Sequence, residues 1–338
     1  MYRFRRALRR IGPPGAGLLL LSAAIAGCAG ASGATVVSQP QAPRPQVSPS
    51  QNADPAPVTA PALTGLPGRD VSKARDGGGG DLRQVQFFSP SLGREDSYLI
   101  YLPPGYSKSA AAGRRFRVLY LLHGDGRHQR HGAGHMFQRG HVATAANAVA
   151  ASQAHPMLIV IPEADDGTVV GDSEWANTSR GRFESAVLDA VHAVDSAWPT
   201  IPNRSARAIA GLSMGGYGAV NVALHHPDVF SVIESWSGYF TQTPTGPFTG
   251  ASRKTLDANS PARYVRSLGS SLAANPMHVL LYSSPTDKLH VQQAPFAAKL
   301  RPLGVPVEAR MFGGPHNYSL WSAHIGLALQ FADRWLTG

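Results

Sequence analysis

The sequence predicts an α/β fold built on a mostly parallel central sheet of about eight strands, with helices on both faces. From residue 81 onward, short apolar runs of strand-forming residues alternate with stretches of helical periodicity. The chain is 43% hydrophobic and 15% charged, which is too hydrophobic for a protein that is disordered throughout. The roughly 255 residues of this part suit one large sheet better than two small domains.

Eight apolar runs are predicted strands. The first two lie close together with a glycine-containing turn between them, so we expect the sheet to begin with an antiparallel pair. In chain order, the predicted strands are 85–88, 98–102, 118–122, 158–161, 206–210, 232–236, 279–282 and 307–312.

Three helices are predicted between and after these strands. Apolar residues recur at helical spacing over 183–198, and Pro199 ends that helix. A second helix is expected between Ser213 and Pro227, and a third over about 318–335. The alternation of strands and helices is what favours the parallel sheet.

The first 27 residues have the three parts of an export signal. Arginines crowd the start, an apolar run covers 18–26, and small residues precede Cys28. The apolar run is too short to cross a bilayer as a permanent helix. We therefore interpret 1–27 as a signal peptide and expect the rest of the chain to be exported.

The residues at 25–28, Ile-Ala-Gly-Cys, resemble the lipobox of bacterial lipoproteins. That resemblance implies cleavage before Cys28 and attachment of diacylglycerol to its sulfur. Cys28 is the only cysteine of the chain, which favours lipidation over ordinary secretion. Because two or three acyl chains anchor stably, we expect the protein on the extracytoplasmic face of the cell membrane, with free secretion as the alternative.

Residues 28–80 are predicted to form a disordered tether, and 81–338 the single folded domain. The tether is rich in Pro, Ser, Ala, Gln and Gly, and it buries too little apolar surface to offset the entropy of ordering. The formal net charge of +10 does not indicate a nucleic-acid partner, because five of these charges are arginines within the first ten residues. The sequence also lacks a basic helix, basic–aromatic interleaving and a zinc module.

The segment 211–216, Gly-Leu-Ser-Met-Gly-Gly, follows a predicted strand and precedes a predicted helix. This is the pattern of a nucleophile elbow, a sharp turn that lifts a serine hydroxyl above the sheet edge. Glycines stand two residues before and after the serine because a Cβ there would clash with backbone. The context favours a nucleophilic Ser213 over an ordinary glycine-rich turn, and makes the N–H of Met214 a candidate oxyanion donor.

A second candidate for the oxyanion hole follows the predicted strand 118–122. That strand runs into His123-Gly124-Asp125, where a hydrolase of this type places its other N–H donor. Asp125 is therefore expected to contribute its amide rather than its carboxylate. His123 is interpreted mainly as a structural residue that bonds nearby backbone, with a substrate contact as the alternative.

The catalytic base has to be chosen among 13 histidines. His316 follows a predicted strand and precedes the last predicted helix, in a loop where a triad histidine can reach the nucleophile. It also gives the chain order serine, acid, histidine. His324 is the alternative, but it falls within the periodicity of the helix.

The acid of the triad is expected at a strand end between the serine and the histidine. Asp287 comes soon after the predicted strand 279–282 and meets this condition. Its carboxylate would fix the tautomer of the imidazole and stabilise the imidazolium. Asp257 and Glu308 are the rivals, but Asp257 lacks a preceding strand and Glu308 falls within one.

These motifs resemble the putative-esterase branch of the α/β hydrolases, which includes feruloyl and acetylxylan esterases, esterase D and the mycolyltransferases. The resemblance rests on the Leu-Leu-His-Gly turn, the serine motif, the Asp287 loop and the Gly-Gly-Pro-His-Asn-Tyr-Ser-Leu-Trp run that ends at Trp321. It covers about 85–335 and implies the α/β-hydrolase fold. It also implies ester hydrolysis or acyl transfer without a metal or organic cofactor.

The expected substrate is an acylated sugar, a polysaccharide or a lipid ester at the cell envelope. An envelope acyltransferase that uses a sugar hydroxyl as acceptor is the first alternative, because it would use the same triad. A non-catalytic binding lipoprotein is the second, but it predicts a damaged triad and all three members are present.

Two further features follow the inner strands. His128, His131, His135 and His141 stand in a glycine-rich stretch, which we interpret as a polar rim rather than a metal site, because no acid or cysteine completes a ligand set. The loop with Asp172, Glu174 and Trp175 is a candidate substrate contact, with Trp175 stacking on a sugar or aromatic ring, or packing a loop. Trp321 is a further candidate contact.

Overall fold

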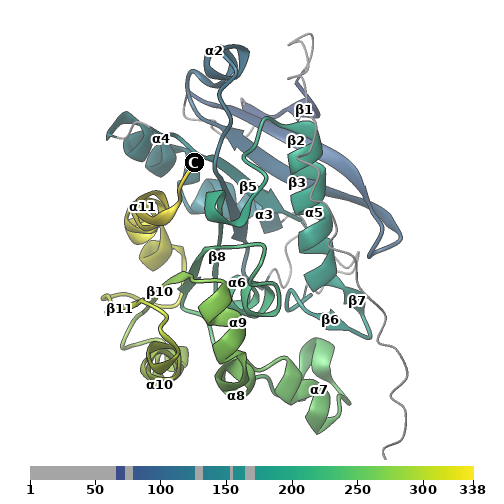
Figure 1. The fold of residues 1–338 in the computed structure, drawn as a ribbon, viewed down its shortest axis with the longest axis vertical. Coiled ribbons are helices and arrows are strands. Elements are labelled where there is room, and N and C mark those ends of the chain that lie inside the picture. Colours follow the sequence, from purple (N-terminus) through teal and green to yellow (C-terminus); the bar gives the residue numbers. More distant parts are fainter. Residues whose placement is uncertain (1–65, 73–78, 126–131, 153–154, 164–171) are drawn as a thin grey trace, which may run out of the picture. The chain divides into compact units, whose positions relative to one another are not determined.

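The computed structural model describes residues 66–72, 79–125, 132–152, 155–163 and 172–338. Within them, nine strands form one sheet in the order β1-β2-β3-β5-β4-β8-β9-β10-β11 (Figure 1). The mostly parallel α/β architecture is confirmed. A separate two-stranded hairpin, β6 and β7, lies outside this sheet.

All eight predicted strands occur, and a ninth, β1, was not predicted. β1 lies before residue 81, where the folded domain was expected to begin, and it pairs antiparallel with β2. It has only two residues, both polar, so it carries no apolar pattern. The strands are β1 Arg69–Asp70, β2 Asp81–Ser89, β3 Arg94–Leu102, β4 Val118–Leu122, β5 Leu158–Pro162, β6 Asn177–Thr178, β7 Gly181–Arg182, β8 Arg207–Leu212, β9 Val232–Trp236, β10 His278–Ser283 and β11 Val307–Met311.

The antiparallel start of the sheet is confirmed by the pairing of β2 with β3, and β3 also pairs antiparallel with β5. From β5 through β4, β8, β9 and β10 to β11, every neighbouring pair is parallel. The carboxyl ends of these six strands therefore lie along the same edge of the sheet. This edge is where ligands bind in open α/β sheets.

Helices cover both faces of the sheet. Alternate residues of β4 enter different cores: Val118 and Tyr120 pack on one side, and Leu119 and Leu121 on the other. The first side is covered by α5, α6 and α10, and the second by α3, α4 and α11. These helices are α3 Gly132–Arg139, α4 Val142–Ser152, α5 Phe183–Ala197, α6 Met214–His225, α10 Gln293–Leu300 and α11 Tyr318–Trp335.

The three predicted helices correspond to α5, α6 and α11. The other helices were not predicted, and several short ones lie between β9 and β10, where the sequence has no long apolar periodicity. The remaining helical turns are α2 Tyr106–Ala111, α7 Arg253–Ala258, α8 Pro261–Tyr264 and α9 Gly269–Ala274, with 3-10 turns η1 Arg204–Ala206, η2 Gly246–Phe248, η3 Val265–Leu268, η4 Lys288–Gln292 and η5 Arg301–Leu303.

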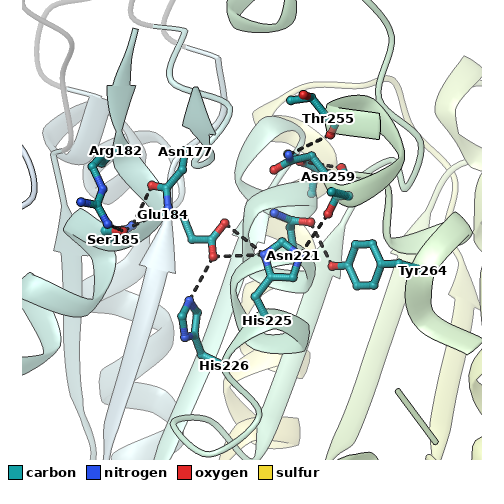
Figure 2. Close-up of polar contacts among 12 residues, drawn as sticks. Asn177, Arg182, Glu184, Ser185, Asn221, His225, His226, Thr255, Asn259 and Tyr264 are labelled. Carbon is teal, nitrogen blue, oxygen red and sulfur yellow. Dashed lines mark hydrogen bonds and ion pairs between the residues drawn. The ribbon is translucent and has the colours of Figure 1, made fainter. Parts of the chain in front are cut away.

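A buried carboxylate ties α5 to the carboxyl end of α6. Glu184 accepts hydrogen bonds from Nδ1 of His225 and Nε2 of His226, each at 3.0 Å (Figure 2). His225 also contacts the carbonyl of Ala258 at the end of α7, through Nε2 at 3.1 Å. We call Glu184, His225 and His226 the Glu184 cluster. It joins the main body to the segment between β9 and β10.

The described helices contain no stretch that is both long and apolar enough to cross a membrane. The predicted signal peptide 1–27 and most of the predicted tether 28–80 lie outside the described residues.

Candidate active site

Ser213 stands at the turn between β8 and α6, in the strained backbone conformation of a nucleophile elbow. Its φ is +55° and its ψ is −117°, outside the regions that ordinary residues prefer. A Cβ on Gly211 would lie 2.3 Å from the carbonyl oxygen of Gly215, and a Cβ on Gly215 would lie 2.0 Å from that of Leu122. The two glycines are therefore required by close backbone approach, as the sequence pattern predicts.

The structure brings Ser213, His316 and Asp287 together from three distant parts of the chain. Nε2 of His316 lies 2.9 Å from the hydroxyl of Ser213, and Nδ1 lies 2.7 Å from Oδ2 of Asp287. The imidazole thus bridges a hydroxyl and a carboxylate, which is the geometry of proton transfer in a triad. The His316 side chain is 32% exposed and that of Asp287 only 3%, so the base is accessible from solvent whereas the acid is buried.

Asp287 is held as an anion by hydrogen bonds. Burial would raise its pKa, but the hydrogen bonds from His316, from the N–H of Leu289 and from the hydroxyl of Ser283 outweigh burial and lower it. A buried carboxylate with a lowered pKa stays charged at neutral pH, so it can stabilise an imidazolium. Ser283 was not predicted, because a serine at a strand end carries no signal of its own.

The loop that carries His316 is fixed on both sides. The hydroxyl of Thr286 donates to the carbonyl of Gly314 at 2.7 Å, which ties the acid loop to the histidine loop. After the histidine, the side chain of Asn317 caps α11 by accepting from the N–H of Ser319 at 2.9 Å. These contacts limit the positions that the imidazole can take.

Trp321 packs against the base rather than facing a ligand. Its ring meets that of His316 edge-on, with centroids 5.0 Å apart, and its indole N–H donates to the hydroxyl of Ser237 at 3.2 Å. The residue is only 6% exposed. Its polar end is used inside the protein and its ring supports His316, and the substrate contact expected at Trp321 stays a prediction.

The rival acids and the rival base are engaged elsewhere. Asp257 pairs with Arg253 and Arg263, and Glu308 pairs with two arginines near the end of the chain, Arg310 and Arg334. His324 stacks on Phe312, with ring centroids 3.7 Å apart, and so packs α11 against the end of β11. None of the three has a hydrogen bond to the members of the triad within the described structure.

The candidate oxyanion donors flank Ser213. Met214 is the first residue of α6, so its N–H has no acceptor within the helix. Asp125 follows Gly124, at which a Cβ would lie 3.4 Å from the Cβ of Ser213. The loop after β4 therefore approaches the serine closely, where its amides can serve a developing oxyanion.

Two other predicted substrate contacts are buried. Trp175 has no exposed surface, and its indole N–H donates to the carbonyl of His123 at 3.0 Å. His123 is 4% exposed, and its ring nitrogens lie 2.8 Å from the carbonyls of Gly124 and Glu163. The structural interpretation of His123 fits this geometry. A substrate contact does not, for either residue, because both rings are enclosed by the protein.

Glu174 belongs to the same predicted contact loop as Trp175, but it is not enclosed by the protein. It is partly exposed, and its Oε2 accepts hydrogen bonds from the hydroxyl of Tyr239 and the amide of Gln242. Burial raises the pKa of Glu174 to about 7. The two hydrogen bonds lower it, whereas the charges of Asp172 and Asp125 raise it further. Tyr239 and Gln242 were missed because they follow β9 in a segment without a recognised motif.

The histidine-rich stretch is described only in part. His128 and His131 lie outside the described residues. His135, on α3, contacts the hydroxyl of Tyr318 through Nδ1 at 3.3 Å, and His141 links α3 to α4 with a φ of +53°. No group of three metal-ligating side chains occurs in the part of the chain that the structure covers.

The order of these elements along the chain defines the class of protein. The serine follows an inner strand, the acid follows a later one, and the histidine follows the last, on a mostly parallel sheet. This is the order of the α/β-hydrolases, and the chain has that fold. A family model described as "Putative esterase" matches residues 89–330, and the chain belongs to this family. It is a serine esterase.

Individual relatives agree with this assignment. An endo-1,4-beta-xylanase/feruloyl esterase of Xylanibacter ruminicola is 28% identical over 164 residues, which cover 47% of this chain and 22% of that protein. A solved ferulic acid esterase superposes with a TM-score of 0.66 at 24% identity, covering 75% of this chain and 98% of the other. An S-formylglutathione hydrolase of Agrobacterium tumefaciens gives 0.62 at 17% identity, covering 77% and 96%.

Proposed function

We propose that the protein cleaves carboxylic esters through an acyl-enzyme formed on Ser213. The single observation that carries this proposal is the position of His316, which is within hydrogen-bond distance of both Ser213 and Asp287. A serine hydroxyl is a weak nucleophile until a base removes its proton, and this imidazole is placed to do so.

The reaction has two halves. In the first, His316 takes the proton of Ser213 as its oxygen attacks the ester carbonyl, and the oxyanion accepts hydrogen bonds from the amides of Met214 and Asp125. His316 then gives its proton to the departing alcohol, and an acyl group remains on the serine. In the second half, water loses a proton to His316 and attacks the acyl group, and His316 then returns that proton to the oxygen of Ser213 as the carboxylic acid leaves.

The proposed substrates are acylated sugars, polysaccharides or lipid esters at the cell envelope. Two relatives support an ester that joins an aromatic acid to a carbohydrate, because one is described as a xylanase/feruloyl esterase and the other as a ferulic acid esterase. The envelope location is proposed from the signal peptide and from Cys28. Replacement of Cys28 by serine is expected to move the protein from the membrane fraction to the soluble exported fraction.

A fluorophosphonate probe tests the nucleophile directly. We expect the probe to label the wild-type protein at Ser213, as peptide mass spectrometry would show, and to leave Ser213→Ala unlabelled. Labelling at another serine, or none at all, would refute the proposed site. A panel of esters that varies the acyl and alcohol parts then defines the substrate. Adding a sugar acceptor to each reaction separates hydrolysis, which yields free acid, from acyl transfer, which yields a new sugar ester.

A further inference from the structure

Glu174 lies at the same edge of the sheet as the proposed nucleophile, although 39 residues separate them in the sequence. Its loop follows β5, and its partners Tyr239 and Gln242 follow β9, whose last residue, Trp236, accepts a hydrogen bond from the N–H of Ser213 at 2.8 Å. The ring of Tyr239 stacks on Tyr217, in the first turn of α6, at 5.2 Å. The carboxyl group therefore stands beside the amino end of the nucleophile helix.

The loop holds Glu174 in a fixed position. Glu174 and Trp175 both have positive φ, at 49° and 48°, which is costly for residues with side chains. The buried side chain of Trp175 anchors the strained turn. Its indole donates to the carbonyl of His123, and a Cβ on Gly218 would fall 2.5 Å from the Cβ of Trp175. Strain of this kind persists only where the surroundings impose one conformation.

The hydrogen bonds at Glu174 leave half of its carboxyl group open. Tyr239 and Gln242 both donate to Oε2, and Oε1 has no hydrogen-bond partner among the residues that the structure describes. When Glu174 is ionised, as it is above its pKa of about 7, a carboxylate oxygen accepts from a hydroxyl more strongly than a neutral acceptor does. A rigid, partly exposed carboxyl group beside the proposed nucleophile, with one oxygen open, is suited to bind a substrate hydroxyl.

We propose that Oε1 of Glu174 accepts a hydrogen bond from a hydroxyl group of the ester substrate and so selects hydroxylated esters. This inference rests on the proposed function and deepens it, because it names the chemical feature that the site recognises. The hydroxyl belongs either to the acyl part, as on a phenolic acid, or to the alcohol part, as on a sugar. A site built around such a bond discriminates against the analogue that lacks the hydroxyl.

The test compares matched esters in the wild type and in Glu174→Gln, which keeps the shape of the side chain. Methyl 4-hydroxycinnamate against methyl cinnamate probes the acyl part, and an acetylated monosaccharide against ethyl acetate probes the alcohol part. We expect Glu174→Gln to reduce kcat/KM about tenfold for the hydroxylated ester of one pair, mainly through KM, and by less than about twofold for its partner. The pair that responds identifies the part that carries the hydroxyl.

Two controls keep the result interpretable. Asp228→Asn changes an exposed carboxylate beyond the far end of α6 and should alter neither pair. Tyr239→Phe removes one donor that holds Glu174 and should weaken the same preference. It therefore tests the inference even where Glu174→Gln folds poorly. Equal losses on both members of each pair, or no loss on any, would overturn the inference. A wild type that neither hydrolyses these esters nor reacts with a fluorophosphonate would instead refute the proposed function itself.

Discussion

Histidine–carboxylate contacts occur at both ends of helix α6. At its amino end, His316 bonds Asp287 at 2.7 Å and presents its other nitrogen to Ser213 at 2.9 Å. At its carboxyl end, His225 bonds Glu184 at 3.0 Å, and its other nitrogen meets the backbone carbonyl of Ala258 (Figure 2). The two pairs contain the same chemical groups at similar distances, but only one of them faces a nucleophile.

The comparison shows what turns such a pair into a candidate catalyst. The second nitrogen of His316 points to a hydroxyl beside a helix amino end, where charge that develops on oxygen is stabilised. The second nitrogen of His225 points to a carbonyl at a helix carboxyl end, where a cationic imidazole is favoured. The first arrangement moves a proton, whereas the second holds α5, α6 and α7 together.

The largest effect is expected from Ser213→Ala. Removal of the nucleophile should lower kcat for p-nitrophenyl acetate by at least about 10⁴-fold, because the oxyanion donors alone leave little catalysis. The thermal unfolding temperature should stay close to that of the wild type, since the side chain is at the surface of the turn. Ser196→Ala, at an exposed serine of α5, serves as the matched control. Near-wild-type turnover by Ser213→Ala would show that the nucleophile lies elsewhere.

The next largest effect on kcat distinguishes the His316–Asp287 pair from the His225–Glu184 pair. Asp287→Asn should reduce kcat by roughly 10³- to 10⁴-fold, because the amide no longer fixes the tautomer of His316. Glu184→Gln makes the same chemical change at the other end of α6 and should leave kcat/KM within about twofold. Steady-state kinetics with one ester measures kcat and kcat/KM for both variants. Comparable losses in the two variants would mean that the Glu184 cluster takes part in the reaction.

The sequence predicted the parts of this molecule that depend on local pattern. The eight predicted strands, α5, α6 and α11 follow from hydrophobic periodicity, and the turn at Ser213 follows from the need for glycine on either side. The convergence of Asp287 and His316 on the serine depends on contacts between residues that are far apart in the sequence. It was foreseeable only because the chain order of an α/β-hydrolase places strand ends side by side.

The sequence could not predict which side chains of a loop face inward. Trp175 and Trp321 were candidate substrate contacts, with loop packing as the alternative for Trp175, and the indole N–H of each donates to a partner inside the protein. Glu174 is partly exposed whereas Trp175, with nearly the same φ, is buried, and no pattern of residue types encodes that difference. The Glu184 cluster likewise joins residues about 40 positions apart without a motif.

A smaller effect is expected on stability. Glu184→Gln replaces a side chain that is 8% exposed and that accepts from two histidines. We expect the free energy of unfolding to fall by about 1–3 kcal/mol, because the amide pairs less strongly and leaves a buried polar group poorly satisfied. Urea denaturation followed by circular dichroism measures the change. An unchanged midpoint and slope would show that the cluster contributes nothing to the fold.

The smallest effect is the pH dependence of the free energy of unfolding that the Glu184 cluster contributes. Burial opposes the charge on Glu184, but the hydrogen bonds from His225 and His226 outweigh it and lower its pKa to about 2 from an ordinary 4.5. Burial likewise opposes the charge on His225, and the hydrogen bond to Glu184 outweighs it and raises the pKa of His225 above 6.5. The carboxylate therefore adds stability that is fully present above pH 4.5 and lost as the pH falls through about 2.

The stability that His225 adds has the opposite pH dependence. It is fully present below pH 6.5 and is lost as the pH rises through the raised pKa of His225. The difference in unfolding free energy between the wild type and Glu184→Gln should thus be greatest between about pH 4.5 and 6.5 and shrink on the alkaline side. Taking this difference removes the free-energy contributions of groups that titrate in both proteins. Urea titrations at half-unit steps from pH 5 to 9 measure it. A difference that stays constant over this range would mean that the charge of His225 contributes nothing to the stability of the cluster.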